Sequence, residues 1–161
     1  MNRILLVFSL LFIAFEASAQ INTTTCKDED LANPYFDCGT FFAPVCGCDG
    51  ITYRNECAAR YHGGLNQGNW QGGSCEPFFF FMFPSMVLTN FRLDIQFKAS
   101  STATLVIRDI FGNVKLQRSI SGSTFAVQYS FDLTTLNPGF YVLSVSNGEH
   151  YQTQKFSLSH P

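Results

Sequence analysis

The placement of the cysteines constrains this chain more than any other feature. The sequence has six cysteines, all in one stretch and none after it: Cys26, Cys38, Cys46, Cys48, Cys57 and Cys75. An even number of cysteines in a short exported segment is typical of a disulfide framework, because such a small domain cannot be held by its core alone. The sequence therefore predicts three disulfides, with their pairing left open.

A zinc site is the alternative use of these thiols, with Cys46 and Cys48 joined by Cys57 or His62. One residue between Cys46 and Cys48 is an unusual spacing, because structural zinc prefers about two to four residues between paired ligands. We therefore expect no metal and no cofactor, and we expect His62 to be an exposed residue at a helix end.

Residues 1–19 have the pattern of a signal peptide. Arg3 supplies a positive charge, Ile4–Phe15 is a short apolar run, and Ala17-Ser18-Ala19 matches a signal peptidase site. The run is too short to span a bilayer, so a membrane anchor or a buried helix is the weaker interpretation. We expect a mature chain that begins at Gln20, is exported, and has no transmembrane segment after cleavage.

The composition changes at Glu76-Pro77, which predicts two domains, residues 20–76 and residues 77–161. The first contains every cysteine and most of the acidic residues, whereas the second is rich in Phe, Val, Ile and Thr. The net charge of −2 gives no basic field for a nucleic-acid partner. The 18 phenylalanines and the low charged fraction of 14% favour β structure and argue against disorder.

Hydrophobic alternation predicts strands throughout the second domain. Phe91, Leu93, Ile95 and Phe97 alternate with polar residues, so one face of that strand should be buried. Further strands are expected at 102–107, 114–120, 124–131, 140–145 and 150–158. Their spacing, with turn residues between them, predicts an all-β antiparallel sandwich of about seven strands.

Residues 78–83 are five phenylalanines and one methionine without interruption. This run is interpreted either as an edge strand covered on both faces or as an apolar linker that joins the two domains. Exposed, it would be an aggregation hazard. We expect a buried edge segment.

The first domain carries a specific motif. Cys38 is followed after seven residues by Cys46, and residues 44–57 read Pro-Val-Cys-Gly-Cys-Asp-Gly-Ile-Thr-Tyr-Arg-Asn-Glu-Cys. This motif resembles the core of Kazal-type serine protease inhibitors, which implies a small disulfide-rich α+β domain with a short helix and a small antiparallel sheet. The residues agree with that fold: Asp49-Gly50 predicts a two-residue hairpin turn, and Asn55 is a good N-cap for a helix over 56–61.

The resemblance also implies a disulfide pairing, namely Cys38–Cys57 and Cys46–Cys75, which leaves Cys26–Cys48. The chain departs from the family at Arg60, where a cysteine usually stands on the helix, and has Cys48 in the hairpin instead. The N-terminal segment should then be stapled to the hairpin, and the orientation of residues 26–37 stays open.

In the family, the protease-binding loop lies between the second and third framework cysteines. Here its residues are Gly39, Thr40, Phe41, Phe42, Ala43 and Pro44. The resemblance implies a reactive bond between Thr40 and Phe41, loop support from Asn55 and Tyr53, and inhibition by a rigid loop that mimics a substrate. The partner would be a serine protease, with elastase-like or subtilisin-like enzymes favoured because Thr40 is small.

No Ser/His/Asp set, carboxylate pair or phosphate loop is present in the sequence, so we do not expect an enzyme. A non-inhibitory Kazal-like protein-binding module on the bacterial surface is the alternative function.

The second domain has looser motifs. They are Asp109-Ile110-Phe111-Gly112 between two strands, Leu133-Thr134-Thr135-Leu136-Asn137-Pro138-Gly139-Phe140-Tyr141, and Lys155-Phe156 near the end. They resemble the C-terminal sorting domain of type IX secretion substrates. This resemblance implies a Gram-negative source, the secretion machinery as a partner, and release from the cell or attachment to the outer-membrane surface. A retained immunoglobulin-like spacer domain is the alternative.

Overall fold

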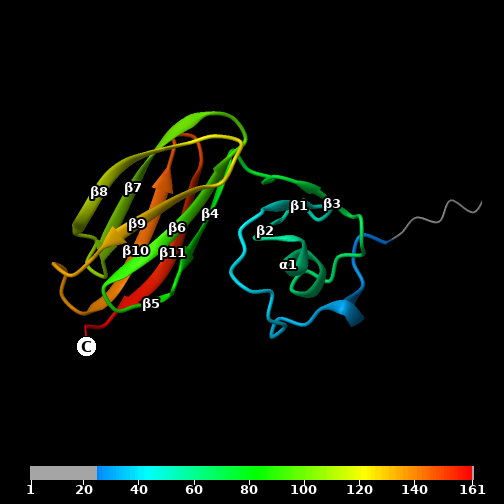
Figure 1. Cartoon of the computed structure of the whole chain (residues 1–161), viewed down its shortest axis with the longest axis horizontal. Helices are drawn as coiled ribbons and strands as arrows, with labels where there is room; N and C mark the ends of the chain where they lie inside the picture. The colour runs from blue at the N-terminus through cyan, green and yellow to red at the C-terminus, as the bar shows by residue number, and fades with distance from the viewer. Residues whose placement is uncertain (1–24, 161) are drawn as a thin grey trace, which may run out of the picture.

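The computed structural model describes residues 25–160, which form two separate units (Figure 1). The expected signal peptide, residues 1–19, lies outside the described residues and stays a prediction. The first unit contains the three disulfides, and the second is a β-sandwich. In the described part of the chain, no helix is long and apolar enough to cross a membrane.

A three-stranded antiparallel sheet and one helix form the first unit. Strand β1 (Val45–Gly47) lies between β2 (Thr52–Tyr53) and β3 (Trp70–Gly72). The helix α1 (Glu56–Tyr61) packs against them, and a 3-10 turn, η1 (Glu29–Leu31), precedes the sheet in the chain. The small core consists of buried Val45, Ala59 and Leu65 with half-buried Cys26, Tyr53 and Trp70 against them.

Three disulfides hold this small core together, and their pairing is the one that the resemblance implies: Cys26–Cys48, Cys38–Cys57 and Cys46–Cys75. The bridges span 22, 19 and 29 residues of sequence. In the chain-entropy model, each closure of this length stabilises the fold by about 3.5 kcal/mol. Because all bridges and the whole core lie within residues 26–75, we expect the first unit to fold without the second.

The expected helix is present with its expected cap, but the expected hairpin turn is wrong. Four residues, not two, separate β1 from β2, and only Gly50 has a positive φ, of +75°. The physical reason is that Asp49 keeps an ordinary backbone and uses its side chain, which accepts hydrogen bonds from Ile51 N–H and Tyr53 Oη–H. Cys48, in the same loop, is tied to Cys26.

The second unit is the expected β-sandwich, and its two sheets contain eight strands in the described residues. One sheet has the order β5 (Met86–Val87), β11 (Tyr151–Leu158), β10 (Gly139–Ser146), β7 (Ser101–Asp109) and β8 (Val114–Gly122). The other sheet has the order β4 (Phe78–Phe83), β6 (Asn90–Phe97) and β9 (Val127–Asp132). All pairs are antiparallel except the short edge pair of β5 with β11, which sequence alternation did not predict.

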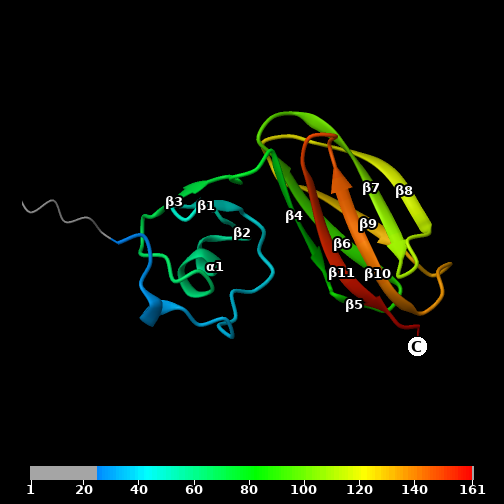
Figure 2. The ribbon, with the colours of Figure 1, turned by 180° about the vertical axis from the view of Figure 1, so that it is seen from behind.

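The phenylalanine run forms strand β4, at the edge of the three-stranded sheet nearest the first unit (Figures 1 and 2). Phe78, Phe80 and Met82 are buried in the sandwich core. Phe79 and Phe81 point to the other face and are only half-buried. The run is therefore an edge strand, as expected, and its second face is turned towards the first unit.

Candidate functional site

The candidate site is the loop between Cys38 and Cys46, on the side of the first unit that faces the sandwich (Figure 1). Both ends are fixed by disulfides, to Cys57 and Cys75. Gly39 has φ +60°, and its N–H donates to the Asp37 carboxylate at 2.8 Å, which starts the loop with a tight turn. At the other end Pro44 is buried against the sheet, whereas the Phe41 side chain is 73% exposed.

Asn55 lies behind this loop and is only 5% exposed. It is the N-cap of α1, so its extended backbone directs its side chain away from the helix and its Oδ1 accepts from Ala58 N–H at 2.9 Å. The same side chain donates through Nδ2 to the carbonyl oxygens of Phe41, at 2.8 Å, and Cys38, at 3.3 Å. One amide thus bridges the loop on both sides of Thr40, whose side chain is exposed.

Arg54, the residue that follows β2, adds a backbone link to the loop. The N–H of Ala43 donates to the carbonyl oxygen of Arg54 at 3.0 Å. Burial lowers the pKa of Arg54, and the nearby Asp37 charge opposes that shift. The loop has no charged side chain between Gly39 and Pro44, so it offers a partner its shape, its backbone groups and the Thr40 hydroxyl.

Tyr53, the second expected support, acts on the hairpin. Its hydroxyl donates to Asp49 Oδ2 at 2.7 Å, and Lys27 Nζ contacts the same oxygen at 2.8 Å. Burial alone would raise the pKa of Asp49, but these hydrogen bonds outweigh it and lower the pKa, whereas burial and the Asp49 charge raise the pKa of Tyr53. The Tyr53 ring leaves no room for a Cβ at Gly63, which locks the hairpin onto the end of α1.

The disulfide Cys26–Cys48 settles the orientation of the N-terminal segment. This segment passes the C-terminal end of α1, where Asp28 N–H donates to Gly64 O and Asn33 N–H donates to Tyr61 O. His62, at that helix end, is exposed, as expected, and its Nε2 contacts Phe36 O at 2.9 Å. The described residues contain no cluster of three potential metal ligands.

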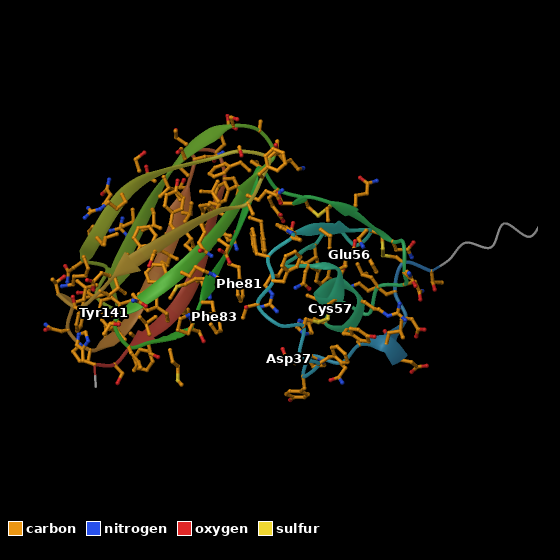
Figure 3. The ribbon with its side chains drawn as sticks, in the orientation of Figure 1. Asp37, Glu56, Cys57, Phe81, Phe83 and Tyr141 are labelled. Atoms are coloured by element: carbon orange, nitrogen blue, oxygen red, sulfur yellow. A yellow bond between two sulfur atoms is a disulfide. The ribbon has the colours of Figure 1, made fainter. Side chains whose placement is uncertain are left out.

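Sequence reasoning missed the residues of the sandwich that contact the loop. The rings of Phe42 and Phe79 stack with centroids 6.1 Å apart, and the Arg54 guanidinium lies 4.4 Å from the centroid of the Phe81 ring. Arg92 Nη2 donates to Thr40 O at 3.4 Å. Figure 3 shows Phe81 on the side of the sandwich that faces the first unit. The only available signal was the uninterrupted apolar run in β4, which does not say what covers its outer face.

The two units match two families. Residues 24–68 match the model of the Kazal-type serine protease inhibitor domain, and residues 88–159 match that of the secretion system C-terminal sorting domain. The two matches follow one another in the order that the sequence resemblances imply, the Kazal-type model first and the sorting-domain model second. The first match supports an inhibitor-like module for serine proteases, of a class that is typically non-enzymatic. The second match indicates a secreted or outer-membrane surface location.

Similarity to solved structures is limited. The chain resembles dimeric latent PorU from Porphyromonas gingivalis, with 14% identity, a TM-score of 0.46, and coverage of 80% of this chain and 17% of that chain. It also resembles β-glucosidases from Erythrobacter marinus (12% identity, TM-score 0.38, coverage 55% and 16%) and Listeria innocua (11%, 0.37, 56% and 17%). The chain thus spans less than a fifth of each of these proteins. None of the curated proteins compared with the chain matches it.

Proposed function

We propose that the first domain inhibits a serine protease by presenting Gly39–Pro44 as a rigid substrate mimic, with Thr40 in the primary specificity pocket and Thr40–Phe41 as the reactive bond. The observation that supports this most is the Asn55 amide, which holds the carbonyl oxygens on both sides of Thr40. A loop fixed in this way loses little conformational entropy when a protease binds. If the bond is cut, the disulfides and Asn55 keep the new ends together, so the products are not released.

Thr40 defines the expected specificity. A trypsin-like pocket contains a buried carboxylate, which Thr40 would leave unpaired at a cost in affinity. A chymotrypsin-like slot would be filled poorly by this small side chain. A shallow or small pocket, as in elastase-like and subtilisin-like enzymes, accepts a β-branched side chain. We therefore propose an elastase-like or subtilisin-like target.

The test is a panel of serine proteases assayed against residues 20–76. We expect inhibition of elastase-like or subtilisin-like enzymes and little inhibition of trypsin. Thr40→Lys should create trypsin inhibition, because loop rigidity comes from the disulfides, Pro44 and Asn55. Tyr35→Lys is the matched control, since this residue is 94% exposed and gains the same charge elsewhere. A panel in which neither the wild type nor Thr40→Lys inhibits any enzyme would exclude an inhibitory loop.

That negative result would favour the second candidate, a non-inhibitory protein-binding module. The observation behind this alternative is that the loop already packs on another surface, through Phe42 and Phe79. A loop used for stable binding to other proteins would be expected to keep these contacts rather than to enter a protease cleft.

A further inference from the structure

The outer face of the three-stranded sheet is not an ordinary solvent-facing surface. A two-residue period places Phe79 and Phe81 of β4 on this face, beside Arg92, Asp94 and Gln96 of β6. Asp94 is only 6% exposed, although it is a carboxylate on the side away from the core. Arg92 and Gln128 of the same sheet hold its oxygens, and Thr40, Phe41 and Phe42 of the first domain line a cleft with it. The first domain lies beside this sheet in Figures 1 and 2.

The part of the first domain that contacts the sheet is the candidate inhibitory loop together with Arg54, the residue that follows β2. Phe42 stacks on Phe79 with the ring planes 2° from parallel. Arg54, whose carbonyl anchors Ala43, places its guanidinium over the Phe81 ring. Stacked rings and cation–π pairs of this kind hold two surfaces together in a defined orientation.

Arg92 contacts the carbonyl of the expected reactive bond itself. Its Nη2 donates to Thr40 O, and the same atom pairs with Asp94 Oδ2 at 3.0 Å. Gln128 of β9 donates to the other Asp94 oxygen at 3.0 Å. Asp94 is therefore fixed between two partners and holds the guanidinium in place, so that one N–H group points at the Thr40 carbonyl.

The Thr40 carbonyl is the group that a serine protease must capture. The oxyanion hole places its donors about 2.7–3.1 Å from the oxygen of the reactive bond, and in the intact chain Arg92 Nη2 already donates to this oxygen at 3.4 Å. A protease also needs about 800 Å² of inhibitor surface around this bond. The space between the loop and the sheet is a cleft of about 510 Å³, lined by Thr40, Phe41, Phe42, Arg92, Asp94 and Gln128 among others, and a cleft of this volume cannot admit a protease domain. The side chains of Thr40 and Phe41 are exposed, but a protease must also reach the Thr40 carbonyl and the surface around the reactive bond, and these face the sheet.

We propose that the sorting domain masks the inhibitory loop, so that the intact chain is a latent inhibitor and becomes active when the two domains separate. This inference rests on the proposed function, and it adds the regulation of the same loop. A protease binds only the open fraction of the chain, so the apparent inhibition constant increases in proportion to the closed population. We expect the intact chain to inhibit at least about tenfold more weakly than residues 20–76.

The experiment compares residues 20–76, the full chain, and full-chain variants that leave the loop sequence intact. Phe79→Ser removes the stacking partner of Phe42 and leaves the Arg92–Asp94 pair in place, with Phe140→Ser as a control at a phenylalanine that is 72% exposed. Arg92→Met removes the donor to Thr40, with Arg118→Met as a control at an exposed arginine on β8. Both test variants should recover at least part of the tenfold difference, whereas the controls should inhibit like the wild-type chain.

Nuclear magnetic resonance gives a readout that needs no protease. The rings of Phe79 and Phe81 should shift the resonances of Phe42 and the Arg54 side chain in the full chain relative to residues 20–76. Equal inhibition by the fragment and the full chain, or coincident resonances, would refute the masking and leave the proposed inhibitor intact. A fragment that inhibits no protease would refute the proposed function instead, and the masking of an inhibitor with it.

Discussion

Asn55 both caps the helix and holds the loop, and replacing its amide nitrogen by an oxygen, as in Asn55→Asp, separates these two roles. Its Oδ1 caps α1, and its Nδ2 holds the carbonyl oxygens of Phe41 and Cys38. Asn55→Ala removes both roles. We expect a loss of about 1 kcal/mol for the cap and about 1 kcal/mol for each hydrogen bond to the loop. The first domain should therefore lose about 3 kcal/mol of unfolding free energy.

Asn55→Asp keeps the cap, because a carboxylate accepts from Ala58 N–H and is favoured at a helix N-terminus. It replaces the donor with an oxygen that faces two carbonyl oxygens, so at neutral pH it should cost about 2 kcal/mol for the two lost hydrogen bonds, and repulsion adds to that cost. The site is 5% exposed, so burial should raise the pKa of the new carboxyl group. When the pKa of a group is higher in the folded state than in the unfolded state, its contribution to stability is complete at a pH below the unfolded-state pKa. That contribution is lost as the pH rises through the folded-state pKa. Protonation restores a donor to the loop.

Denaturant unfolding with the disulfides intact, followed by tryptophan fluorescence, measures the unfolding free energy of the first domain. The single tryptophan, Trp70, packs against the core of that domain and therefore reports on it alone. Relative to wild type, Asn55→Asp should become less stable from acid to neutral pH, and Asn55→Ala should show a constant loss. Gln67→Glu, at an exposed position, controls for the added charge. If Asn55→Asp matched the wild type at neutral pH, the amide would contribute nothing to the loop, and our account of its rigidity would be wrong.

Two further predictions concern the sorting domain. The Asp109 side chain accepts hydrogen bonds from the Asn113 side chain and from the backbone of Phe111 and Asn113, and it pairs with Lys115; together these contacts lower its pKa to about 2. Its stabilising contribution should therefore be lost as the pH falls from about 4 towards 2. Thermal unfolding measured over this pH range should depend less on pH in Asp109→Asn than in the wild type. A Cβ at Gly122 would collide with the buried ring of Phe97, so Gly122→Ala should destabilise the sandwich by about 1–3 kcal/mol in denaturant unfolding, whereas Gly72→Ala, which meets no atom within 4 Å, should be neutral.

Local rules predicted the elements that depend on local chemistry. The cap at Asn55, the helix that follows it and the strand with Phe91 to Phe97 all require only a short window of sequence. The hairpin turn does not follow the same kind of rule, because Asp-Gly predicts a backbone turn whereas the Asp49 side chain serves as a hydrogen-bond acceptor. The choice between these uses depends on Lys27 and Cys26, which are distant in the sequence.

The site was predicted less completely than the fold. The motif located the loop and Asn55, but it contained no information about Arg92 or Asp94, which alternation placed on a polar outer face. The contact of Arg92 with Thr40 forms only where the two domains meet. Contacts of this kind combine residues far apart in the sequence, and no periodicity within either domain encodes them.

The phenylalanine run is the one feature of the sequence that indicates a contact between the two domains. A strand exposes alternate residues on opposite faces, so six consecutive apolar residues in β4 require a cover on both faces. The sandwich core covers Phe78 and Phe80, and it cannot also cover Phe79 and Phe81. A second apolar surface must therefore lie against the outer face, and the loop of the first domain supplies it through Phe42. The edge strand that completes the sandwich is thus also the surface that contacts the candidate loop of the first domain, so a change in one domain should be measurable in the other.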